Sequence, residues 1–599
     1  MASVESLLPK DLAPDPVKTS RRRVLPWLFV IVAVGVFYWL LRLVVIGCPQ
    51  TYEDGSMHFK YGSIGSDNLR RGIPYDIWRI LPGMFHRHLP KGKQQTYEAF
   101  GLIIDKRDRP DEQDTISCEQ TYGCFGFERI TDKQDKQDRP IGFSKRWHLG
   151  VGNVVGLNCA FCHVSTVRQV AGGPQETILG MPANTVDAEA FFRFLFDVAD
   201  DPEFTVENVM THIERKRSEL KERQLGYWQR FIQRRIVVPL FIRGLKNLKH
   251  TFSFLDRRPT PFGPGRVDTW AAYKVLRLQE PAWFMEYLPE WFGPYIDMDA
   301  GPVTGLADFP ALWKEKPDGG AFHWDGNTRV REERNITAAL GAGVTPATLD
   351  FENLKRIARW MESNLKPVEY HKTAPPSSII AVVLGHGESI FNRLCYDCHH
   401  EQGERIRTLE PVDPRMLSPD SHYQPLPARP GLLASRTVCT MASHCSLQDD
   451  VDSTKDKAEN YIGTDPERLR AFTEELSDKL NEVRHLSVWR LENYWMTQGY
   501  ANMLLTGVWL RAPYLHNGSV PTLWHLLQDP SKRPTEFCRG NDLYDWENVG
   551  FEWDSTKDNC QGFFKYQTRL KGNGNGGHFY GTDLSDPDKR ALIEYLKTL

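Results

Sequence analysis

Apolar residues recur every three or four positions in two well-marked stretches of the chain, a spacing that predicts amphipathic helices. The first stretch covers 348–365, where Thr348 can cap the helix and Pro367 follows its end. The second lies at the end of the chain, where Ser585 is the expected cap and Pro587 falls in the first turn. Both helices should bury one face against a core.

The rest of the chain divides into helix-prone and loop-prone segments. Residues 185–250 contain little Pro, with apolar residues at helical spacing in 186–196 and a charged, helix-prone segment at 214–235. Residues 49–140 are polar and rich in Gly and Pro, and 258–330 is a loop region heavy in Gly, Pro and Trp. Few strands are expected, so the predicted fold class is mainly α.

A long apolar run near the start of the chain predicts a membrane segment. It extends from Val24 to Leu41, continues beyond Arg42 and follows three arginines. About 20 apolar residues span a bilayer and basic flanks stay cytoplasmic, so the rest of the chain is expected on the periplasmic side of the bacterial inner membrane. No Ala-x-Ala cleavage site follows the run, which favours an uncleaved anchor. A cleaved twin-arginine signal and a lipoprotein lipidated at Cys48 are the alternatives.

The charge balance argues against a nucleic-acid-binding protein. The chain has 74 basic and 77 acidic residues, whereas nucleic-acid binding requires a basic face. Cysteine spacing fits an oxidising compartment, because six of the cysteines fall in close pairs: Cys118/Cys124, Cys439/Cys445 and Cys538/Cys560. Disulfide bonds within these pairs are one prediction, and buried free thiols are the alternative.

Two copies of the pattern Cys-x-x-Cys-His indicate a c-type cytochrome. They are Cys159-Ala-Phe-Cys162-His163 and Cys395-Tyr-Asp-Cys398-His399. One helical turn presents both sulfurs and the imidazole to the same porphyrin face, so the sulfurs can form thioethers and the histidine can bind the iron. A single copy could instead bind zinc or perform thiol redox chemistry. Two copies downstream of an export signal predict two covalently bound haem c groups.

The second axial ligand is expected to differ between the two haems. His578 lies in a Gly-rich loop just before the last helix, where cytochrome c units place a distal ligand. The matching segment before the 348–365 helix, at 338–344, is apolar and contains no His or Met. A haem with two protein ligands transfers electrons, whereas an open haem can bind O2 or peroxide. The second haem is therefore expected to be closed by His578 and the first to be open.

The order of features repeats along the chain, with a haem motif, a long middle segment and a terminal amphipathic helix in each half. Similar loops at 324–327 and 516–519 strengthen this pattern, which indicates a divergent duplication. We therefore expect a cytoplasmic tail and anchor, a loop-rich extension, a first cytochrome c-like domain with an insertion, and a second such domain. Their expected ranges are 1–48, 49–140, 141–375 and 376–599.

Several of these segments resemble a known family. Gly156-Leu-Asn-Cys159, Trp324-Asp-Gly326 and the segment 512–518 resemble the bacterial di-haem cytochrome c peroxidase superfamily, over roughly residues 140–599. Its branch of rubber oxygenases and pseudomonad fatty-acid dioxygenase and diol synthase proteins is resembled by the segments 263–268, 324–327, 333–335, 517–522 and 577–596. That branch implies one haem that binds O2, a second haem for electron transfer or structure, and an apolar substrate.

The resemblance assigns roles to individual residues. His163 and His399 match the proximal ligands, and His578 matches the distal ligand of the C-terminal haem. Trp324 matches a tryptophan between the haems whose ring can relay an electron. His516 matches a histidine near a haem propionate, and a loop-organising histidine is the alternative.

One position departs from the peroxidases, which have an acidic residue about twenty positions after that tryptophan to help cleave the O–O bond by general acid–base catalysis. Here the position is Val344, in a neutral segment. The resemblance also places Ala338, Ala339 and Leu340 at the distal wall, with a buried segment that makes no substrate contact as the alternative. An apolar pocket does not readily deliver protons to peroxide, but it can host a hydrocarbon chain.

Three functions remain open. The favoured hypothesis is a haem-dependent dioxygenase that uses O2 on an unsaturated apolar substrate, either a fatty acid such as oleate or polyisoprene. The second is a peroxidase that reduces hydrogen peroxide with electrons from a small redox partner. The third is a non-enzymatic electron carrier, which would need a further ligand for the first haem, such as His323. A substrate carboxylate could meet any of Arg193, Arg215, Arg234, Arg235 and Arg243.

Overall fold

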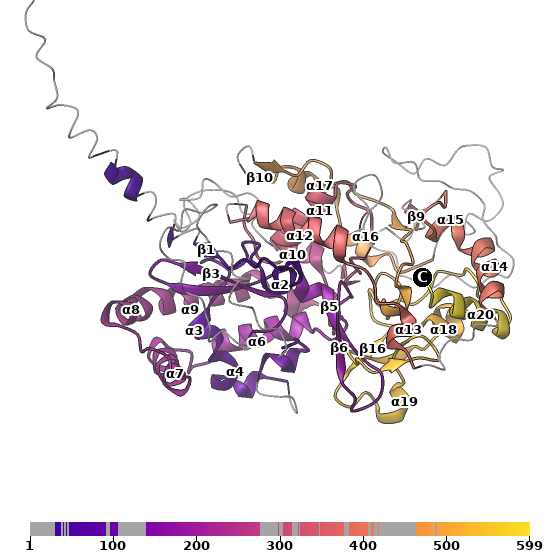
Figure 1. Ribbon diagram of the computed structural model, residues 1–599, viewed down its shortest axis with the longest axis horizontal. Helices are drawn as coiled ribbons and strands as arrows, with labels where there is room; N and C mark the ends of the chain where they lie inside the picture. Colours follow the sequence, from indigo (N-terminus) through magenta and orange to yellow (C-terminus); the bar gives the residue numbers. More distant parts are fainter. Residues whose placement is uncertain are drawn as a thin grey trace, which may run out of the picture.

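The computed structural model describes residues 30, 32–37, 40, 43–44, 47–90, 96–105, 139–275, 298, 304–313, 322, 324–346, 348–375, 383–404, 409–412, 417, 463–485 and 488–599. They form an elongated body that the N-terminal segment leaves at one end (Figure 1). Among these residues, no helix is both long enough and apolar enough to cross a bilayer. The expected transmembrane helix is therefore not supported by the described part of the chain, and much of its apolar run lies outside that part.

A four-stranded antiparallel sheet leads into the first haem motif. Phe143 pairs with Leu157 across its central hairpin, and Arg146 forms buried ion pairs with Asp67 and Asp350. The strands are short, and one of the two longest, at 143–148, is almost wholly buried. Apolar and polar residues therefore do not alternate along it, and the sequence pattern did not predict the sheet. The strand order is β1 (Cys48–Pro49), β3 (Phe143–His148), β4 (Gly152–Leu157), β2 (Ile73–Pro74).

Helices pack around a phenylalanine-rich core beside this sheet. Phe143 and Phe161 from the sheet and the first haem motif meet Phe191 and Phe194 of the insertion there. The core thus ties the insertion at 185–250 to the haem motif. The helical elements of this region are α3 (Tyr75–Trp78), α4 (Leu81–Met84), η1 (His86–His88), η2 (Tyr97–Phe100), α6 (Ala188–Asp200), α7 (Val206–Glu219), α8 (Tyr227–Ile232), η3 (Gln233–Val237), α9 (Val238–Thr251) and η4 (Ser253–Arg257).

Two helices cross closely in the C-terminal half: α14 (Leu384–Leu394) and α20 (Asp586–Leu596). Gly387 lies at the crossing, where a Cβ atom would be 2.0 Å from the carbonyl oxygen of Ala591. One turn later, the rings of Phe391 and Tyr595 pack with their centroids 5.2 Å apart. The crossing places α15 (Tyr396–His399), which carries the second haem motif, directly after α14.

The N-terminal half repeats this arrangement with α2 (Gly55–Tyr61) and α12 (Phe351–Asn364). A Cβ atom on Gly55 would overlap the ring of Trp360, and Phe59 stacks on the same ring at 5.5 Å. Both crossings therefore use glycine and, four positions on, phenylalanine. Residues 49–90 were expected to be a loop-rich extension, yet they supply this helix and two strands of the sheet.

The remaining elements complete the fold. The helical ones are α5 (Ala160–His163), α10 (Thr269–Val275), α11 (Arg331–Gly341), α13 (Tyr370–Thr373), α16 (Glu467–Ala471), α17 (Glu474–Asn481), η8 (Val508–Leu510), α18 (Leu523–Leu526), η9 (Pro530–Lys532) and α19 (Ser555–Asp558). The strand pairs are β5 (Val164–Arg168) with β6 (Gln175–Leu179), β7 (Arg266–Val267) with β8 (Ala307–Asp308), β9 (Leu409–Pro411) with β12 (Gly499–Ala501), β10 (Arg484–His485) with β11 (Trp489–Arg490), β13 (Glu536–Arg539) with β16 (Phe564–Gln567), and β14 (Tyr544–Asp545) with β15 (Gly550–Phe551).

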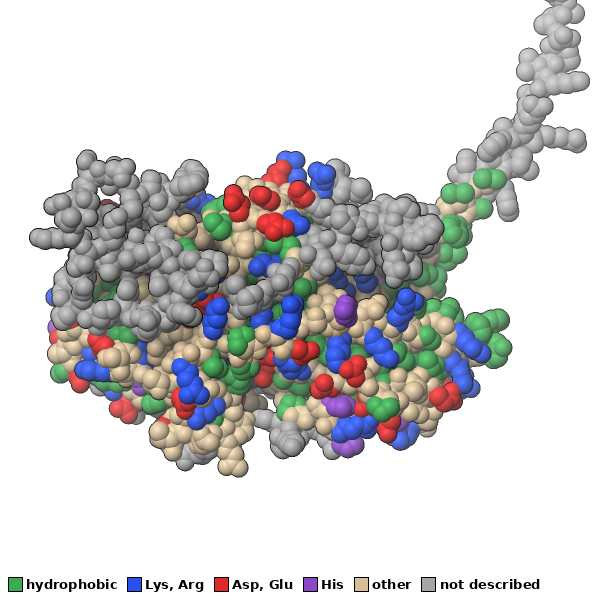
Figure 2. Space-filling view, turned by 180° about the vertical axis from the view of Figure 1, so that it is seen from behind, with side chains coloured by type: hydrophobic (Ala, Val, Ile, Leu, Met, Phe, Trp, Pro, Cys, Tyr) green, Lys and Arg blue, Asp and Glu red, His purple; other side chains and the backbone are tan. Residues whose placement is uncertain are grey.

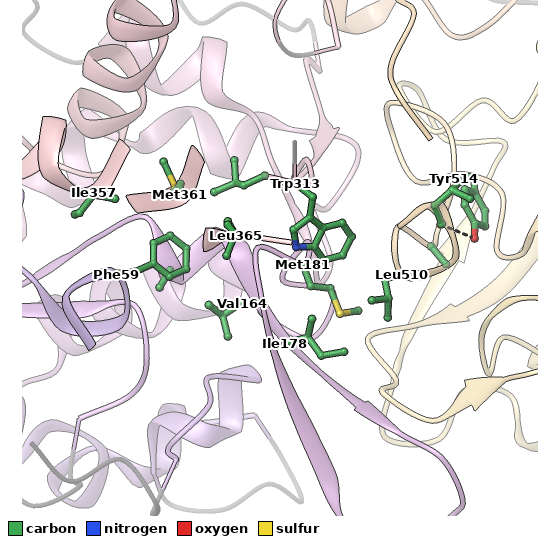
Figure 3. Close-up of a cluster of buried hydrophobic side chains, with 14 of the residues drawn as sticks. Phe59, Val164, Ile178, Met181, Trp313, Ile357, Met361, Leu365, Leu510 and Tyr514 are labelled. Atoms are coloured by element: carbon green, nitrogen blue, oxygen red, sulfur yellow. Dashed lines mark hydrogen bonds between the residues drawn. The ribbon is translucent and has the colours of Figure 1, made fainter. Parts of the chain in front are cut away.

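One hydrophobic core joins the two halves. Met181 and Trp313 from the N-terminal half lie beside Leu510 from the C-terminal half (Figure 3). The indole of Trp313 also donates a hydrogen bond of 2.9 Å to the carbonyl oxygen of Leu179. Because this core is continuous, the two haem motifs are held in a fixed relation to each other.

The two amphipathic helices that the sequence predicts are both present in the structure. The last helix is confirmed, with Ser585 as its cap and Pro587 in its first turn. The 348–365 helix is present as α12, but its cap is Asp350, because Thr348 bonds Thr345 instead. The charged helix predicted over 214–235 is interrupted between α7 and α8. Helices predominate over strands among the described residues, as expected, and the strands are short.

The cysteine prediction is partly confirmed. Cys538 and Cys560 form a disulfide bond between β13 and the segment before β16. The pairs Cys118/Cys124 and Cys439/Cys445 lie outside the described residues. Cys48, which the spacing does not assign to a pair, is disulfide-bonded. A disulfide at this sulfur is incompatible with the lipidated Cys48 considered above.

Gly387→Ala should destabilise the protein, because the new methyl group meets a backbone oxygen that cannot move away without shifting α20. We expect a loss of about 1–3 kcal/mol, read from the midpoint of urea unfolding. Gly385→Ala is the matched control, since a Cβ on Gly385 meets nothing within 4 Å. It should be neutral or stabilising, and equal destabilisation by both variants would contradict the close crossing.

Candidate haem-binding site

The first haem motif is fixed by the residue that precedes it. The Asn158 side chain donates to the carbonyl oxygens of Lys60 and Gly62, at 3.2 and 3.1 Å, and accepts from the backbone N–H of Ala160 at 3.0 Å. It thereby joins the start of α5 to the end of α2. Gly142 passes so close to α5 that a Cβ atom would lie 2.4 Å from the backbone of Phe161. Only glycine fits there, with φ at +94°.

The side chains of the first motif suit covalent haem attachment. His163 Nδ1 bonds the carbonyl oxygen of Pro310 at 2.9 Å, which assigns the proton to Nδ1 and makes Nε2 the nitrogen that can bind iron. Cys159 and Cys162 are free thiols on the same turn. Burial raises the pKa of Cys159 to about 11, and the nearby Arg334 guanidinium lowers it by less.

The second motif repeats this geometry. His399 Nδ1 bonds the carbonyl oxygen of Met503 at 2.7 Å, again making Nε2 the nitrogen that can bind iron. Cys395 and Cys398 are present as thiols. Burial raises the pKa of Cys395 to about 12, with a smaller contribution from Cys398.

A second imidazole faces His399. The ring of His578 has its centroid 6.3 Å from that of His399. Metal–imidazole bonds are about 2.0 Å long, so two imidazoles on opposite sides of one metal ion have centroids about 6 Å apart. Burial lowers the pKa of His578 to about 3, helped by His399 and Arg533. The ring is therefore neutral, the form that binds metals, and its buried Nδ1 has no hydrogen-bond partner among the residues that the structure describes.

The loop that carries His578 is held in a strained shape. His578 has φ of +52°, a left-handed conformation that is costly for a residue with a side chain. Arg533 offsets this cost by donating to the carbonyl oxygens of Asn575, Gly577 and His578, at 2.6, 2.9 and 3.2 Å. The loop thus aims an imidazole at the second motif through bonds made to its backbone.

The segment beside the first motif is different. Helix α11 presents Ala338 as an exposed residue, while Ala339, Leu340 and the following Val344 are buried in the apolar core. Tyr494 Oη donates to Thr337 Oγ1 at 2.7 Å, which fixes the helix. No His, Met or Cys occurs in α11.

The two acidic side chains of α11 interact with residues other than those of the first haem motif. Glu333 is buried, but its carboxylate accepts hydrogen bonds from the backbone N–H and the side-chain amide of Asn493, at 2.9 and 2.6 Å. Glu332 is exposed and lies 3.7 Å from Lys355. The described residues of α11 therefore contain no carboxylate left to serve as a proton donor beside Ala338.

Asp308 connects the loop that carries Trp324 with the loop that carries His516. Its backbone N–H donates to the carbonyl oxygen of His516 at 2.8 Å, and its carbonyl oxygen accepts from Trp324 Nε1 at 2.9 Å. Its carboxylate pairs with Arg539, which also bonds Gly518 at 3.1 Å. The half-buried Trp324 and the buried His516 therefore share one backbone support.

His516 is also stacked on an aromatic ring. Tyr500 lies parallel to it, with centroids 4.1 Å apart, and the Tyr500 hydroxyl donates to the carbonyl oxygen of Asp465 at 2.6 Å. His516 Nε2 is 3.1 Å from that hydroxyl, and Nδ1 is 3.4 Å from Thr464 Oγ1. Burial lowers the pKa of His516 well below its usual value, so the ring is neutral.

Comparison with known proteins adds an assignment for part of this region. Residues 499–538 match the family described as RoxA-like, cytochrome c-like. The matched segment contains Tyr500 and His516, together with Met503, which bonds His399, and Arg533, which holds the His578 loop. The match supports a RoxA-like di-haem cytochrome, and it implies covalent haem c and an oxidoreductase.

Two curated relatives come from Sinorhizobium fredii (strain NBRC 101917 / NGR234), and both are named as uncharacterized. Protein y4iM is 28% identical over 315 residues, which is 50% of this chain and 65% of the relative. Protein y4iJ is 42% identical over 104 residues, which is 16% of this chain and 17% of the relative. The chain spans less than two thirds of the length of either.

Three residues at the site were not anticipated from the sequence: Asp308, Tyr500 and Arg533. Asp308 and Arg533 form hydrogen bonds that involve backbone carbonyl groups, and no sequence pattern marks such bonds. Tyr500 is one of 21 tyrosines and has no motif of its own. His323, named as a further ligand in the electron-carrier hypothesis, lies outside the described residues.

Arg533→Lys should loosen the His578 loop, since a single ammonium group cannot reach carbonyl oxygens that the guanidinium spans with two nitrogens. Each buried carbonyl left without a donor costs about 1–3 kcal/mol. We expect faster hydrogen–deuterium exchange in residues 573–581 and a lower urea midpoint. Arg569→Lys replaces an exposed arginine nearby and should change neither. Unchanged exchange in Arg533→Lys would contradict this role.

Proposed function

We propose that the protein is a di-haem oxidoreductase that dioxygenates an unsaturated apolar substrate. The observation that supports this most is the difference between its two haem motifs. The imidazole of His399 is opposed by His578 at 6.3 Å, whereas α11 beside the first motif contains no His, Met or Cys. A closed haem suits electron transfer, and an open one suits O2 chemistry.

Each haem would be held by residues already described. Cys159, Cys162 and His163 would hold the first, and Cys395, Cys398, His399 and His578 the second. When bound, the first haem supplies an iron centre capable of O2 chemistry. Pro310 and Met503 keep the proximal imidazoles in the required tautomer through their carbonyl oxygens.

The residues of α11 would provide the substrate contact. Ala338 is the exposed member of the segment, and Ala339, Leu340 and Val344 back it with apolar side chains. An apolar wall binds a hydrocarbon chain by burying its surface, and the absence of an available carboxylate on α11 disfavours peroxide cleavage, which requires proton transfer. These features favour a fatty acid such as oleate, or polyisoprene, over hydrogen peroxide.

The same proposal includes a route for electrons between the haems and a cellular location for the protein. Trp324 would carry an electron between the haems, and His516 would lie near a haem propionate. The disulfide Cys538–Cys560 supports the periplasmic side of the inner membrane, because disulfides persist in oxidising compartments. A small redox protein would supply electrons where the reaction requires them.

The proposal is tested by incubating the full chain, loaded with haem, with O2 and a panel of unsaturated lipids that includes oleate and polyisoprene. We expect O2 uptake and products that carry both oxygen atoms, detected by mass spectrometry with ¹⁸O₂. Turnover of hydrogen peroxide with a reduced cytochrome, and none of O2 with any lipid, would identify a peroxidase instead.

Ala338→Leu adds bulk at the one exposed position of the apolar wall, where the fold can accept it. We expect a several-fold higher KM for the lipid with unchanged stability. Ala171→Leu, at an exposed position between β5 and β6, is the control, and it should leave KM unchanged. Equal KM values for all three proteins would remove α11 from the substrate site.

A further inference from the structure

Several large apolar side chains are exposed on α8, η3 and α9. Tyr227 and Trp228 are 78% and 71% exposed, and Leu240 is 63% exposed. Phe231 and Ile236 are about half exposed, at 46% and 47%. Among the described residues no other element exposes as many large apolar side chains, apart from the N-terminal segment. Such a surface indicates an interaction partner.

The π-helical turn brings these side chains onto one face. Trp228 and Leu240 are separated by twelve positions, which at about 100° per residue would place them about 120° apart on an uninterrupted α-helix. The π turn η3 takes up one extra residue, which reduces that offset to about 20°. Pro239 explains the turn, because it has no N–H to bond the carbonyl oxygen of Arg235.

The same helices are strongly basic. Residues 227–251 contain six Lys and Arg residues and no Asp or Glu, although the whole chain has a net charge of −3. Arg230 and Arg234 pair with Glu214 and Glu207 of α7. Within the described part of the chain, no ion pair is made by Arg235, Arg243 or Lys246, which are exposed. Their charges are available to an anionic partner.

The basic aromatic face, defined by Trp228, Phe231, Arg235, Leu240 and Arg243, adjoins the end of the N-terminal apolar run. Gln233 donates to the carbonyl oxygen of Val151 at 2.8 Å, in the β3–β4 turn. The same turn meets the N-terminal segment, because Leu149 N–H bonds the carbonyl oxygen of Leu43 at 3.0 Å.

Figure 2 shows hydrophobic side chains next to Lys and Arg at this end of the molecule, below the departing N-terminal segment. Val32, Val34 and Phe37 of that segment are themselves exposed. Apolar side chains from two distant parts of the chain therefore gather at one end.

We propose that the basic aromatic face rests on the surface of an anionic phospholipid bilayer. Trp and Tyr favour the headgroup region of a membrane, and an amphipathic helix with basic residues lies in the plane of that region. Anionic headgroups match the unpaired Arg235, Arg243 and Lys246 in charge. This contact does not depend on the proposed reaction, but it would hold the protein where apolar substrates accumulate.

The test uses the full chain with vesicles of phosphatidylcholine and a minority of phosphatidylglycerol, together with a photoactivatable phospholipid. After illumination, adducts are located by peptide mass spectrometry. We expect adducts within 227–240, reduced several-fold in pure phosphatidylcholine vesicles. Absence of adducts from 227–240 overturns the proposal, whether or not residues 24–47 are labelled, and would leave the face for a protein partner.

Variants separate the two components of the contact. W228S/F231S/L240S should lose most adducts in 227–240, and R235E/R243E should lose them in the anionic vesicles by several-fold. V170S/V488S/F563S removes three other exposed apolar side chains, on other parts of the surface, and it should keep full labelling. If this control loses the adducts to the same degree as W228S/F231S/L240S, the labelling is not specific to the face and the proposal fails.

Discussion

The opposition of His399 and His578 is the constraint on which the C-terminal half depends. Placing two neutral imidazoles 6.3 Å apart requires a helix that carries one and a loop that carries the other. The helix is positioned by the α14–α20 crossing at Gly387, and the loop takes a left-handed turn at His578. Arg533 stabilises that turn through carbonyl groups rather than side chains. The geometry at this motif is thus determined by the backbone around it.

The N-terminal half uses the same crossing but ends in a different surface. Gly55 and Phe59 pack on Trp360 much as Gly387 and Phe391 pack on α20. Where the C-terminal half has a histidine loop, however, the N-terminal half has α11 with its apolar residues. Asp308 links the halves, since its backbone bonds both Trp324 and His516. Two similar units therefore present different groups to their haem motifs within one continuous core.

Features that depend on residues close in sequence could be predicted, and features that depend on distant residues could not. The haem motifs, the last helix with its Ser585 cap and the Cys538–Cys560 pair were predictable because each depends on residues close in sequence. The partner of α12 was not, because Gly55 precedes α12 by nearly 300 positions. Arg533 was missed for another reason, since it recognises carbonyl oxygens that every residue has. The alignment of Trp228 with Leu240 on one face of α8–α9 depends on the π turn just before Pro239, and the sequence alone does not reveal that turn.

The most direct test of the account is a carbon monoxide titration of the reduced full-length protein carrying both haems, followed by optical spectroscopy. Carbon monoxide binds reduced haem iron only at an open coordination position. One molecule bound for every two haems is predicted, and His578→Ala should raise this to two. Binding of none, or of two by the unaltered protein, would contradict the division between a closed and an open haem.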